Sequence, residues 1–379
     1  MAVHAASALR ALRTPLEPLI KAAGGLFAEG RSGGEVGRLV PPLPPRQRIA
    51  PPVWEELPLY HRPGRVVLLD DDPDFVDMLR MSVPGHWQAN GFLSGTSCLN
   101  YLQQEPPKWE ADFWAQQELI GVWHLGAPLI PLVLRYWATS PERRSLAKVL
   151  VADHHMPGMD GLEALQELVD WPGKRVLLTG SFDEDLATRA FNSGLIDKFL
   201  VKQRSHGLLG SIVDAVEGLL AKPNLRHHQI WSATLKPAQF EALRRPGVSE
   251  QLGTYLRSTF EEWVVIGDPF GVLALDARGN ATWLQLEMAA QLDELADMCE
   301  ACGAPTGDVA DVRAGRKISN IEMRRALAMR GAQTIPALQV GDEPGLLAAP
   351  SPVDIRFRNL APDQVATERH DQPENQCAY

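Results

Sequence analysis

A short apolar strand that ends on an aspartate places the strongest constraint on this chain. Residues 149–152 read Val-Leu-Val-Ala, which predicts a strand that is buried on both faces. Asp153 ends the strand, a Met-Pro-Gly-Met-Asp-Gly turn follows, and leucines recur at helical spacing from Leu162 to Leu168. Open α/β sheets place ligands at the carboxyl ends of their strands, so Asp153 is a candidate functional residue. The same aspartate could instead cap the helix that follows, and the other strands must decide between these interpretations.

Strand and helix signals alternate between residues 65 and 204, which predicts a doubly wound sheet of parallel strands. A weak strand is expected over 87–93, and each of the three remaining strands is followed at once by polar residues. These strands and residues are 65–69 with Asp70 and Asp71, 175–178 with Thr179, and 198–201 with Lys202. The carboxyl ends of parallel strands meet at one edge of a sheet, so these side chains should gather around Asp153. Their convergence favours the functional interpretation.

Three carboxylates are therefore expected to meet, those of Asp70, Asp71 and Asp153. Carboxylates at close range repel one another and shift their pKa values unless a cation neutralises them. An all-oxygen ligand set with room for water suits Mg²⁺. An aspartate in such a site can accept a phosphoryl group, because aspartyl phosphate is a known covalent intermediate. Thr179 then offers a hydroxyl group, and Lys202 a positive charge, to the phosphoryl oxygens.

This pattern resembles the receiver domain of two-component response regulators over residues 65–220. The matching features are Asp-Asp after the first strand, Asp-x-x-Met-Pro-x-Met-Asp-Gly after the third, Thr after the fourth and Lys after the fifth. The resemblance implies a flavodoxin-like, five-stranded parallel sheet and Mg²⁺ as cofactor. It also implies a cytoplasmic protein that receives its phosphoryl group from a sensor histidine kinase or a phosphotransfer protein. Enzymatic activity is expected only for its own phosphorylation and dephosphorylation.

The resemblance implies a role for each site residue. The roles are phosphoacceptor for Asp153, metal ligation for Asp70, Asp71, Asp153 and the backbone carbonyl of His155, phosphate sensing for Thr179 and Lys202, and switching for Phe199. His155 also occupies a variable position that tunes the access of water to the phosphoryl group. Gln203 stands where receivers usually have proline, so the loop after Lys202 is expected to differ in shape.

The sequence is narrower than the general receiver pattern in two stretches. These are Leu-Leu-Thr-Gly at 177–180 and Ala-Phe-Asn-Ser-Gly-Leu-Ile-Asp-Lys-Phe at 190–199, with Lys-Gln at 202–203. They are similar to a subgroup of response regulators that includes quorum-sensing regulators with a non-standard output region. Membership of that subgroup would account together for Gln203 and for a long insertion in the receiver.

The insertion spans residues 105–147, between the second helix and the third strand of the receiver. It carries four of the ten tryptophans, Trp109, Trp114, Trp123 and Trp137. Aromatic side chains concentrate in cores and at interfaces. The insertion is therefore expected to be helical, and either packs on itself or forms a surface for a second copy or another partner.

The whole chain is expected to divide into five segments. They are an amphipathic helical segment at 1–30, a Pro/Gly-rich linker at 31–64, the receiver at 65–222, an α+β output domain at 223–360 and a disordered tail at 361–379. Within the output domain, apolar runs at 271–276 and 281–286 around Arg-Gly-Asn predict a β-hairpin. A helix over 286–302 places Cys299 and Cys302 on one face, which favours core packing over a zinc site.

The formal net charge of −10 argues against a general nucleic-acid or anionic-membrane binder. No apolar run is long enough to cross a bilayer, and the spacing of the four cysteines gives no disulfide framework. We therefore expect an output through protein contacts, with a homodimer as the first candidate. The alternative is a nucleic-acid- or nucleotide-binding regulator that acts through the C-terminal domain.

Overall fold

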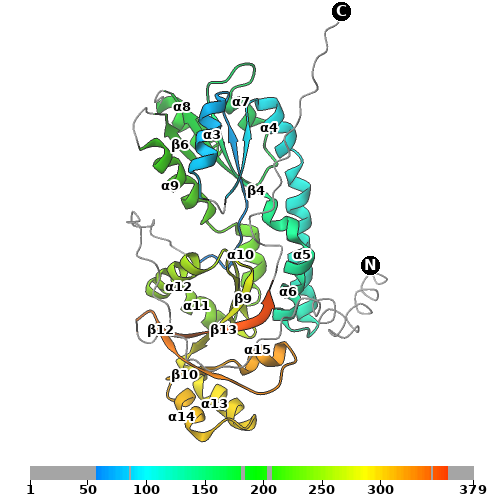
Figure 1. The fold of residues 1–379 in the computed structure, drawn as a ribbon, viewed down its shortest axis with the longest axis vertical. Helices are drawn as coiled ribbons and strands as arrows, with labels where there is room; N and C mark the ends of the chain where they lie inside the picture. Colours follow the sequence, from blue (N-terminus) through cyan, green and yellow to red (C-terminus); the bar gives the residue numbers. More distant parts are fainter. Residues whose placement is uncertain (1–56, 85–86, 181–183, 203–206, 343–344, 357–379) are drawn as a thin grey trace, which may run out of the picture. The chain divides into compact units, whose positions relative to one another are not determined.

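The computed structural model describes residues 57–356, apart from 85–86, 181–183, 203–206 and 343–344. All of these residues belong to one unit of the chain, which begins at Pro51. The predicted helical segment at 1–30, most of the linker, the disordered tail at 361–379 and Gln203 lie outside the described residues. Two large sheets and one of only two strands are present in the described part of the chain (Figure 1).

The first sheet has five parallel strands in the order β3-β2-β4-β5-β6. The strands are β2 (Arg65–Leu69), β3 (Gln88–Phe92), β4 (Ala147–Asp153), β5 (Lys174–Thr179) and β6 (Lys198–Val201). This order is that of flavodoxin-like sheets, so the predicted fold class is confirmed. Residues along the central strands are buried on both faces of the sheet, because helices cover each face.

Alternate residues of these strands feed two separate cores. Val67, Leu150 and Leu177 pack with α4 (Gly95–Leu102), α7 (Gly161–Gln166) and α8 (Glu184–Asn192). On the opposite face, buried residues of the same strands pack with α3 (Pro73–Ser82) and α9 (Leu208–Leu220). The period of two along each strand explains why these segments read as continuous apolar runs in the sequence.

The second sheet is antiparallel and has the order β1-β7-β8-β9-β13-β12. Its strands are β1 (Tyr60–His61), β7 (Glu262–Gly267), β8 (Phe270–Leu275), β9 (Asn280–Met288), β12 (Leu338–Val340) and β13 (Leu346–Arg356). The predicted hairpin is confirmed as β8 and β9. Its turn depends on Asp276, whose carboxylate accepts hydrogen bonds from the backbone N–H groups of Arg278 and Asn280 (2.8 Å each), and on Gly279 at φ +76°.

One segment differs from its predicted state. The linker was expected to extend to residue 64, but Tyr60 and His61 form an edge strand that pairs with Val264 and Trp263. Tyr60 is buried beside this pairing, together with Leu57 and Leu59. These apolar residues directly follow the proline-rich stretch. The segment is too short to show the alternation of apolar and polar residues by which a strand is predicted.

Helices and two short strands complete the C-terminal region. They are α10 (Leu225–Ser232), α11 (Pro237–Arg244), α12 (Pro246–Thr259), η2 (Ala289–Gln291), α13 (Leu292–Ala301), α14 (Thr306–Arg313), β10 (Lys317–Ser319), α15 (Ile321–Ala326) and β11 (Thr334–Pro336). The predicted helix over 286–302 begins later than expected, because β9 continues to Met288. Cys299 lies in a small apolar core, whereas Cys302 is exposed.

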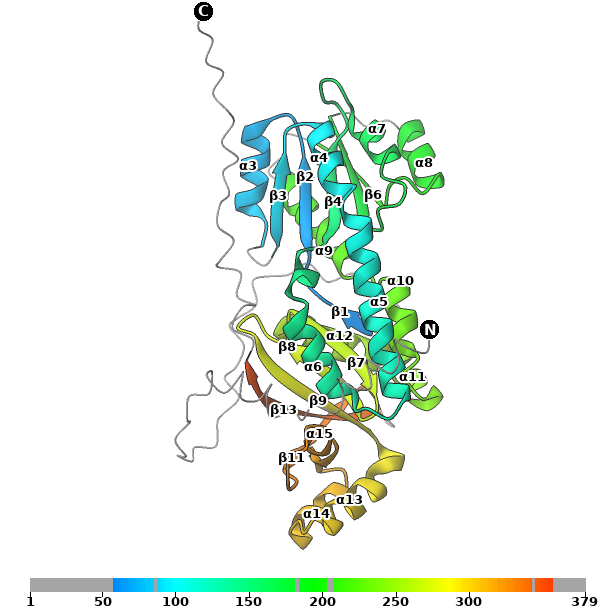
Figure 2. The same cartoon turned by 90° about the vertical axis from the view of Figure 1, so that its right-hand side faces the viewer.

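The receiver insertion forms α5 (Glu105–His124), α6 (Leu129–Thr139) and the short 3-10 helix η1 (Pro141–Ser145). Leu129, Val133 and Trp137 of α6 are buried in the same core as the strands of the second sheet (Figure 2). The insertion therefore neither packs only on itself nor leaves α6 open to a partner. An almost wholly apolar helix needs a large apolar surface, and the second sheet supplies it. None of the helices in the described part of the chain is long and apolar enough to cross a membrane.

Candidate functional site

Five polar residues lie at the carboxyl ends of the receiver strands. Asp70 directly follows β2, Asp153 ends β4 and Thr179 ends β5, and all three are buried. Lys202 follows β6 and is partly buried, whereas Asp71 is exposed. The parallel pairing of β2 with β4, of β4 with β5 and of β5 with β6 brings these strand ends to one edge of the sheet.

The ammonium group of Lys202 links two of the carboxylates. Its Nζ lies 2.6 Å from Oδ2 of Asp70 and 2.9 Å from Oδ1 of Asp153. Burial by itself lowers the pKa of Lys202, but the hydrogen bonds and charges of Asp153 and Asp70 together raise it, so the amine is protonated at neutral pH. Burial raises the pKa of Asp70, and the bond from Lys202 opposes this rise. The ammonium is therefore held between two acids by direct contacts.

The three aspartates also fit a divalent cation. Asp70, Asp71 and Asp153 each offer a carboxylate oxygen, and these oxygens all lie within 4.8 Å of one another. Oxygens on opposite sides of a Mg²⁺ ion are separated by about 4.2 Å, since each lies about 2.1 Å from the metal. One lysine cannot balance three carboxylates, so a second cation would reduce the repulsion that remains. The donor set is the hard, all-oxygen kind that Mg²⁺ prefers. The carbonyl of His155 stays a predicted further ligand.

Asp153 does not cap the helix that follows it. Asp160 takes that place at the start of α7, where its side chain accepts a hydrogen bond from the N–H of Glu163 (2.7 Å). The Glu163 side chain accepts one in return from the N–H of Asp160 (3.1 Å), which completes a capping box. The helix terminus is thus satisfied without Asp153, whose carboxylate is left for Lys202 and for chemistry at the sheet edge.

The backbone beneath Asp153 depends on one glycine. The N–H of Gly161 donates to the carbonyl of His154 (3.1 Å), and the N–H of His154 donates to the carbonyl of Leu178 (2.7 Å). A Cβ on Gly161 would lie 2.0 Å from the carbonyl oxygen of Asp153, so a side chain there forces the two segments apart. Gly161 therefore fixes the height at which Asp153 leaves the sheet.

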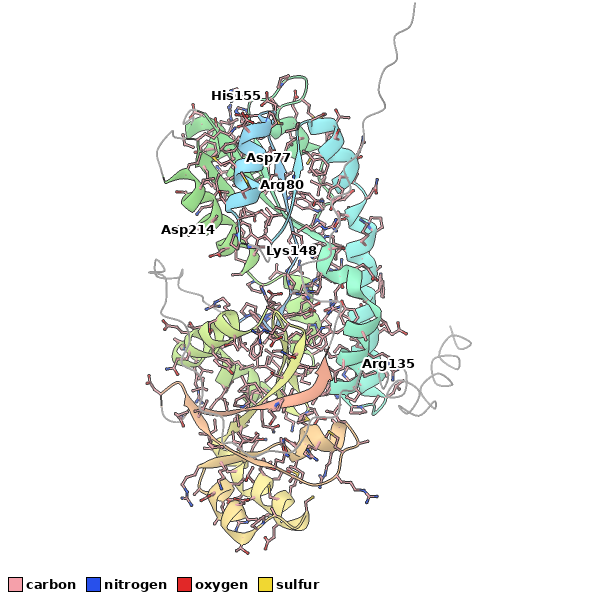
Figure 3. The ribbon with its side chains drawn as sticks, in the orientation of Figure 1. Asp77, Arg80, Arg135, Lys148, His155 and Asp214 are labelled. Carbon is pink, nitrogen blue, oxygen red and sulfur yellow. The ribbon has the colours of Figure 1, made fainter. Side chains whose placement is uncertain are left out.

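His155 and Phe199, the two other predicted site residues, lie outside the group of side chains around Lys202. His155 is exposed beyond the end of β4, and its ring lies 4.2 Å from that of His154 (Figure 3). Phe199 lies on β6 and is partly buried against the core that contains Leu177 and Ile196. Phe199 therefore has a packing environment that a change at the sheet edge can alter, and its role as a switch stays a prediction.

Phe75 is a site residue that the sequence reasoning treated only as a helix marker. The Nζ of Lys202 lies 4.6 Å from the centroid of its ring, which is within the range of a cation–π contact. The position was readable in principle, since Phe75 stands in the first turn of the helix that follows Asp70 and Asp71. That turn begins at the same edge of the sheet, so its side chains border the site.

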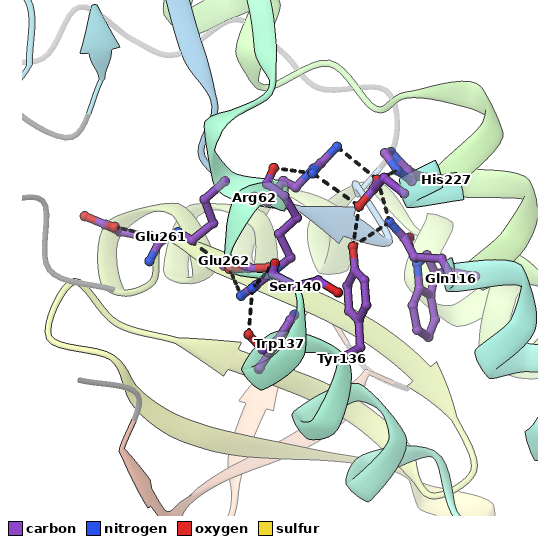
Figure 4. A network of polar contacts seen from close by, with 12 residues as sticks. Arg62, Gln116, Tyr136, Trp137, Ser140, His227, Glu261 and Glu262 are labelled. Atoms are coloured by element: carbon purple, nitrogen blue, oxygen red, sulfur yellow. Dashed lines mark hydrogen bonds and ion pairs between the residues drawn. The ribbon is translucent and has the colours of Figure 1, made fainter. Parts of the chain in front are cut away.

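A second group of charges is buried between α5, β1 and α10 (Figure 4). The Nη2 of Arg62 lies 3.0 Å from Oδ2 of Asp112, and both side chains are almost fully buried. Asp112 also accepts hydrogen bonds from Gln116 (3.0 Å) and from the Tyr136 hydroxyl, and its Oδ2 lies 3.2 Å from Nε2 of His227. Burial lowers the pKa of His227 to about 4, so the imidazole is neutral at neutral pH. The charges of Arg62 and Asp112 therefore balance each other.

Two arginines of η1 continue this group toward the second sheet. Nε and Nη2 of Arg143 lie 2.8 and 2.9 Å from the two carboxylate oxygens of Glu262 on β7, and this pair is completely buried. Arg144 lies 2.8 Å from Glu261 in the same strand region. We call these residues, together with Arg62 and Asp112, the buried charge network. Because η1 directly precedes β4, the network connects β7 to the strand that ends on Asp153.

No family model matches the sequence, and no curated protein matches it. Among solved structures, the chain is similar to the response regulator LqsR of Legionella pneumophila, with 22% identity and a TM-score of 0.56 over 79% of this chain and 90% of LqsR. A receiver domain of the Francisella response regulator 1452 matches 41% of this chain and 95% of its own length, at 16% identity and a TM-score of 0.27. A CheY-like receiver protein of Methanospirillum hungatei JF-1 matches 42% and 94%, at 12% identity and 0.26.

The likeness to LqsR concerns the fold. It covers more of this chain than the receiver segment alone, so it extends into the second sheet. The chain thus shares the fold of LqsR, and in this chain a five-stranded parallel sheet is joined to a six-stranded antiparallel one. The roles of the individual site residues remain predictions.

Proposed function

We propose that the chain is the response regulator of a two-component phosphorelay, and that Asp153 accepts the phosphoryl group. The observation that carries the proposal is the ammonium of Lys202, bonded to both Asp70 and Asp153, with the Asp71 carboxylate beside them. Such a set holds a nucleophilic oxygen, a cation for phosphoryl oxygens and the ligands for Mg²⁺ at one edge of the sheet. The donor would be a sensor histidine kinase or a phosphotransfer protein.

In the proposed reaction, a carboxylate oxygen of Asp153 attacks the phosphorus of a phosphohistidine or an acyl phosphate. The new P–O bond forms as the bond to the leaving imidazole or carboxylate breaks, and the leaving group keeps the electron pair. Bound Mg²⁺ would neutralise charge on the phosphoryl oxygens. Lys202 would exchange its contact with Asp153 for a phosphoryl oxygen, and the Thr179 hydroxyl would donate to another.

The proposed output follows from what β4 and β6 contact. Movement of Lys202 shifts the end of β6, where Phe199 packs against the core. At its other end, β4 follows η1, whose Arg143 is bonded to Glu262 of the second sheet. A phosphoryl group can bias this connection by its differential contacts, typically about 1–3 kcal/mol. We propose that the bias changes dimerisation or other protein contacts.

Phosphorylation is tested with acetyl phosphate and Mg²⁺ on the full chain, followed by intact mass measurement. The wild type should gain the mass of one phosphoryl group, and the adduct should be lost at high pH. Asp153→Asn should gain none, whereas Asp160→Asn, which changes an aspartate of the same loop but keeps a capping side chain, should react like the wild type. Equal labelling of Asp153→Asn and the wild type would contradict the assignment.

The output is tested by light scattering over a concentration series, with and without beryllofluoride as a phosphoryl mimic. A coupling of about 1–3 kcal/mol corresponds to a roughly 5- to 150-fold change in dimer affinity. The large exposed side chain of Trp114 on α5 offers a site for a variant, since Trp114→Gln removes apolar surface without touching the core. A monomer under every condition would exclude dimerisation and leave contacts with another protein as the output.

A further inference from the structure

A cavity lies at the opposite end of the receiver sheet from Asp153. Its lining comes from the beginnings of β4 and β5, the end of α9, the start of α10 and the edge strand β1. Its cavity volume is about 60 Å³, and it opens to solvent. Lys148 belongs to this lining, and Figure 3 labels it at the amino-terminal end of β4, far along the strand from His155.

The lining is rich in cations and contains no carboxylate. Lys148, Lys174 and Lys222 all contribute to it. Lys174 is paired, since its Nζ lies 2.9 Å from Asp197. Within the described part of the chain, no carboxylate lies within ion-pair distance of Lys148 or Lys222. In a protein with a net charge of −10, this gathering of unbalanced lysines in a hollow is unusual.

Two lining residues, Trp109 and Lys148, have few polar partners in the protein. The indole of Trp109 is almost fully buried, and its Nε1–H has no hydrogen-bond partner among the described residues. A buried donor without a partner is unfavourable. Lys148 donates only to the carbonyl of Arg62, and burial together with Arg62 lowers its pKa to about 7. A negatively charged oxygen in the cavity would stabilise the ammonium of Lys148.

We propose that this cavity binds a small metabolite through a phosphate group, whose oxygens pair with Lys148 and Lys222. Lysine is a common phosphate ligand that acts as a point charge, and the aromatic and proline side chains of the lining can cover the uncharged part of such a molecule. The bound molecule would contact the receiver through β4 and the second sheet through β1. It would therefore act on the same connection as the proposed phosphorylation, from the other end of β4 and independently of Asp153.

The test is isothermal titration of the full chain with inorganic pyrophosphate, in the presence of EDTA so that the acidic edge cannot hold a metal–pyrophosphate complex. The wild type should bind one pyrophosphate saturably, and acetate at least about tenfold more weakly because it carries a single charge. Loss of one charge-assisted bond of about 1.5–3 kcal/mol should weaken binding by about ten- to hundredfold in Lys222→Met and in Lys148→Met.

Lys198→Met is the matched control, since Lys198 is an exposed lysine of β6 that does not line the cavity. It should bind like the wild type. Lys222 is exposed, so its replacement leaves the fold intact and keeps the test valid even if Lys148→Met does not fold. The proposal is overturned if the wild type shows no saturable binding, or if Lys222→Met binds pyrophosphate as tightly as Lys198→Met does.

Discussion

The carboxyl end of the first sheet and the buried charge network differ in the balance of their charges. The edge of the first sheet holds three carboxylates against the single ammonium of Lys202, and one of them, Asp71, is open to solvent. The buried charge network has as many acidic as basic groups, with Arg62, Arg143 and Arg144 against Asp112, Glu261 and Glu262. A balanced, closed set contributes to structure. An unbalanced, open set is instead a candidate site for an ion or a ligand.

A third group lies between these extremes. Glu287 and Glu322 are bridged by the side-chain amide of Gln285, whose Nε2 lies 2.8 Å from one carboxyl group and 2.7 Å from the other. Trp283 holds the Gln285 carbonyl in place through a hydrogen bond of 2.7 Å. Burial raises the pKa of Glu287 to about 8 and also raises that of Glu322. Here the imbalance is relieved by protonation rather than by a cation.

The largest effect is expected where the balance is broken. Glu262→Gln leaves the Arg143 guanidinium buried without its counter-charge, so the free energy of unfolding should fall by about 3–5 kcal/mol. Urea denaturation followed by tryptophan fluorescence measures the loss. Glu261→Gln, whose pair with Arg144 is more exposed, should lose about 1 kcal/mol or less. The double variant Arg143→Met with Glu262→Leu should recover much of the loss, because no unpaired charge remains. Equal losses for Glu262→Gln and Glu261→Gln would refute the distinction.

The protonated acid gives a pH-dependent effect. The pKa of Glu287 is about 8 in the folded chain against 4.5 ordinarily, so the folded chain binds more protons between these values. Stability should therefore fall as the pH rises through this range, and Glu287→Gln should remove that fall. Its advantage over the wild type should grow by about 1.4 kcal/mol for each unit between about pH 5 and pH 7. Denaturation at several pH values measures this, with Glu300→Gln on the exposed face of α13 as control. Parallel curves for wild type and Glu287→Gln would show that Glu287 is ionised.

A smaller effect is expected from the backbone beneath the acidic edge. Gly161→Ala places a Cβ against the carbonyl of Asp153, which should cost about 1–3 kcal/mol and slow labelling by acetyl phosphate. Gly210→Ala in α9 meets nothing within 4 Å and should instead stabilise the chain by about 0.5–1 kcal/mol. Thermal melts and labelling rates of the two variants provide the comparison. If Gly161→Ala is destabilised but is labelled at the normal rate, Gly161 affects stability and not the reaction at Asp153.

The smallest effect on stability is expected from Mg²⁺ binding to the three aspartates of the first sheet. Mg²⁺ at ten times its dissociation constant should stabilise the wild type by about 1.4 kcal/mol, because only the folded chain assembles the three aspartates. Asp71→Asn, which changes an exposed ligand, should fold normally and lose most of this gain. A melting temperature that responds equally to Mg²⁺ in both proteins would place the cation elsewhere.

The acidic edge was predictable because each of its residues directly follows an apolar strand. A parallel sheet then brings Asp70, Asp153 and Lys202 together without further information. The capping alternative for Asp153 was settled only by the structure, since Asp160 forms the capping box. The sequence thus predicts features that depend on neighbouring residues, such as a strand with a period of two and a polar residue at its end.

The buried charge network was out of reach for the opposite reason. Arg143 and Glu262 are 119 positions apart, and neither stands in a pattern that marks it as buried. The placement of α6 in the core of the second sheet likewise depends on a surface formed far along the chain. The tryptophans of the insertion predicted that it packs on itself or on a partner, and the sequence offered no way to tell that the second sheet covers α6.

The pairing of β1 with β7 has a consequence for synthesis. Tyr60 pairs with Val264, which is synthesised about 200 residues later, or about 10–40 s later at ordinary rates of translation. The five strands of the receiver are all made within that interval. A nascent chain can therefore fold the receiver while β1 is still unpaired. When β7 later pairs with β1, the second sheet forms from segments on both sides of a receiver that is already folded.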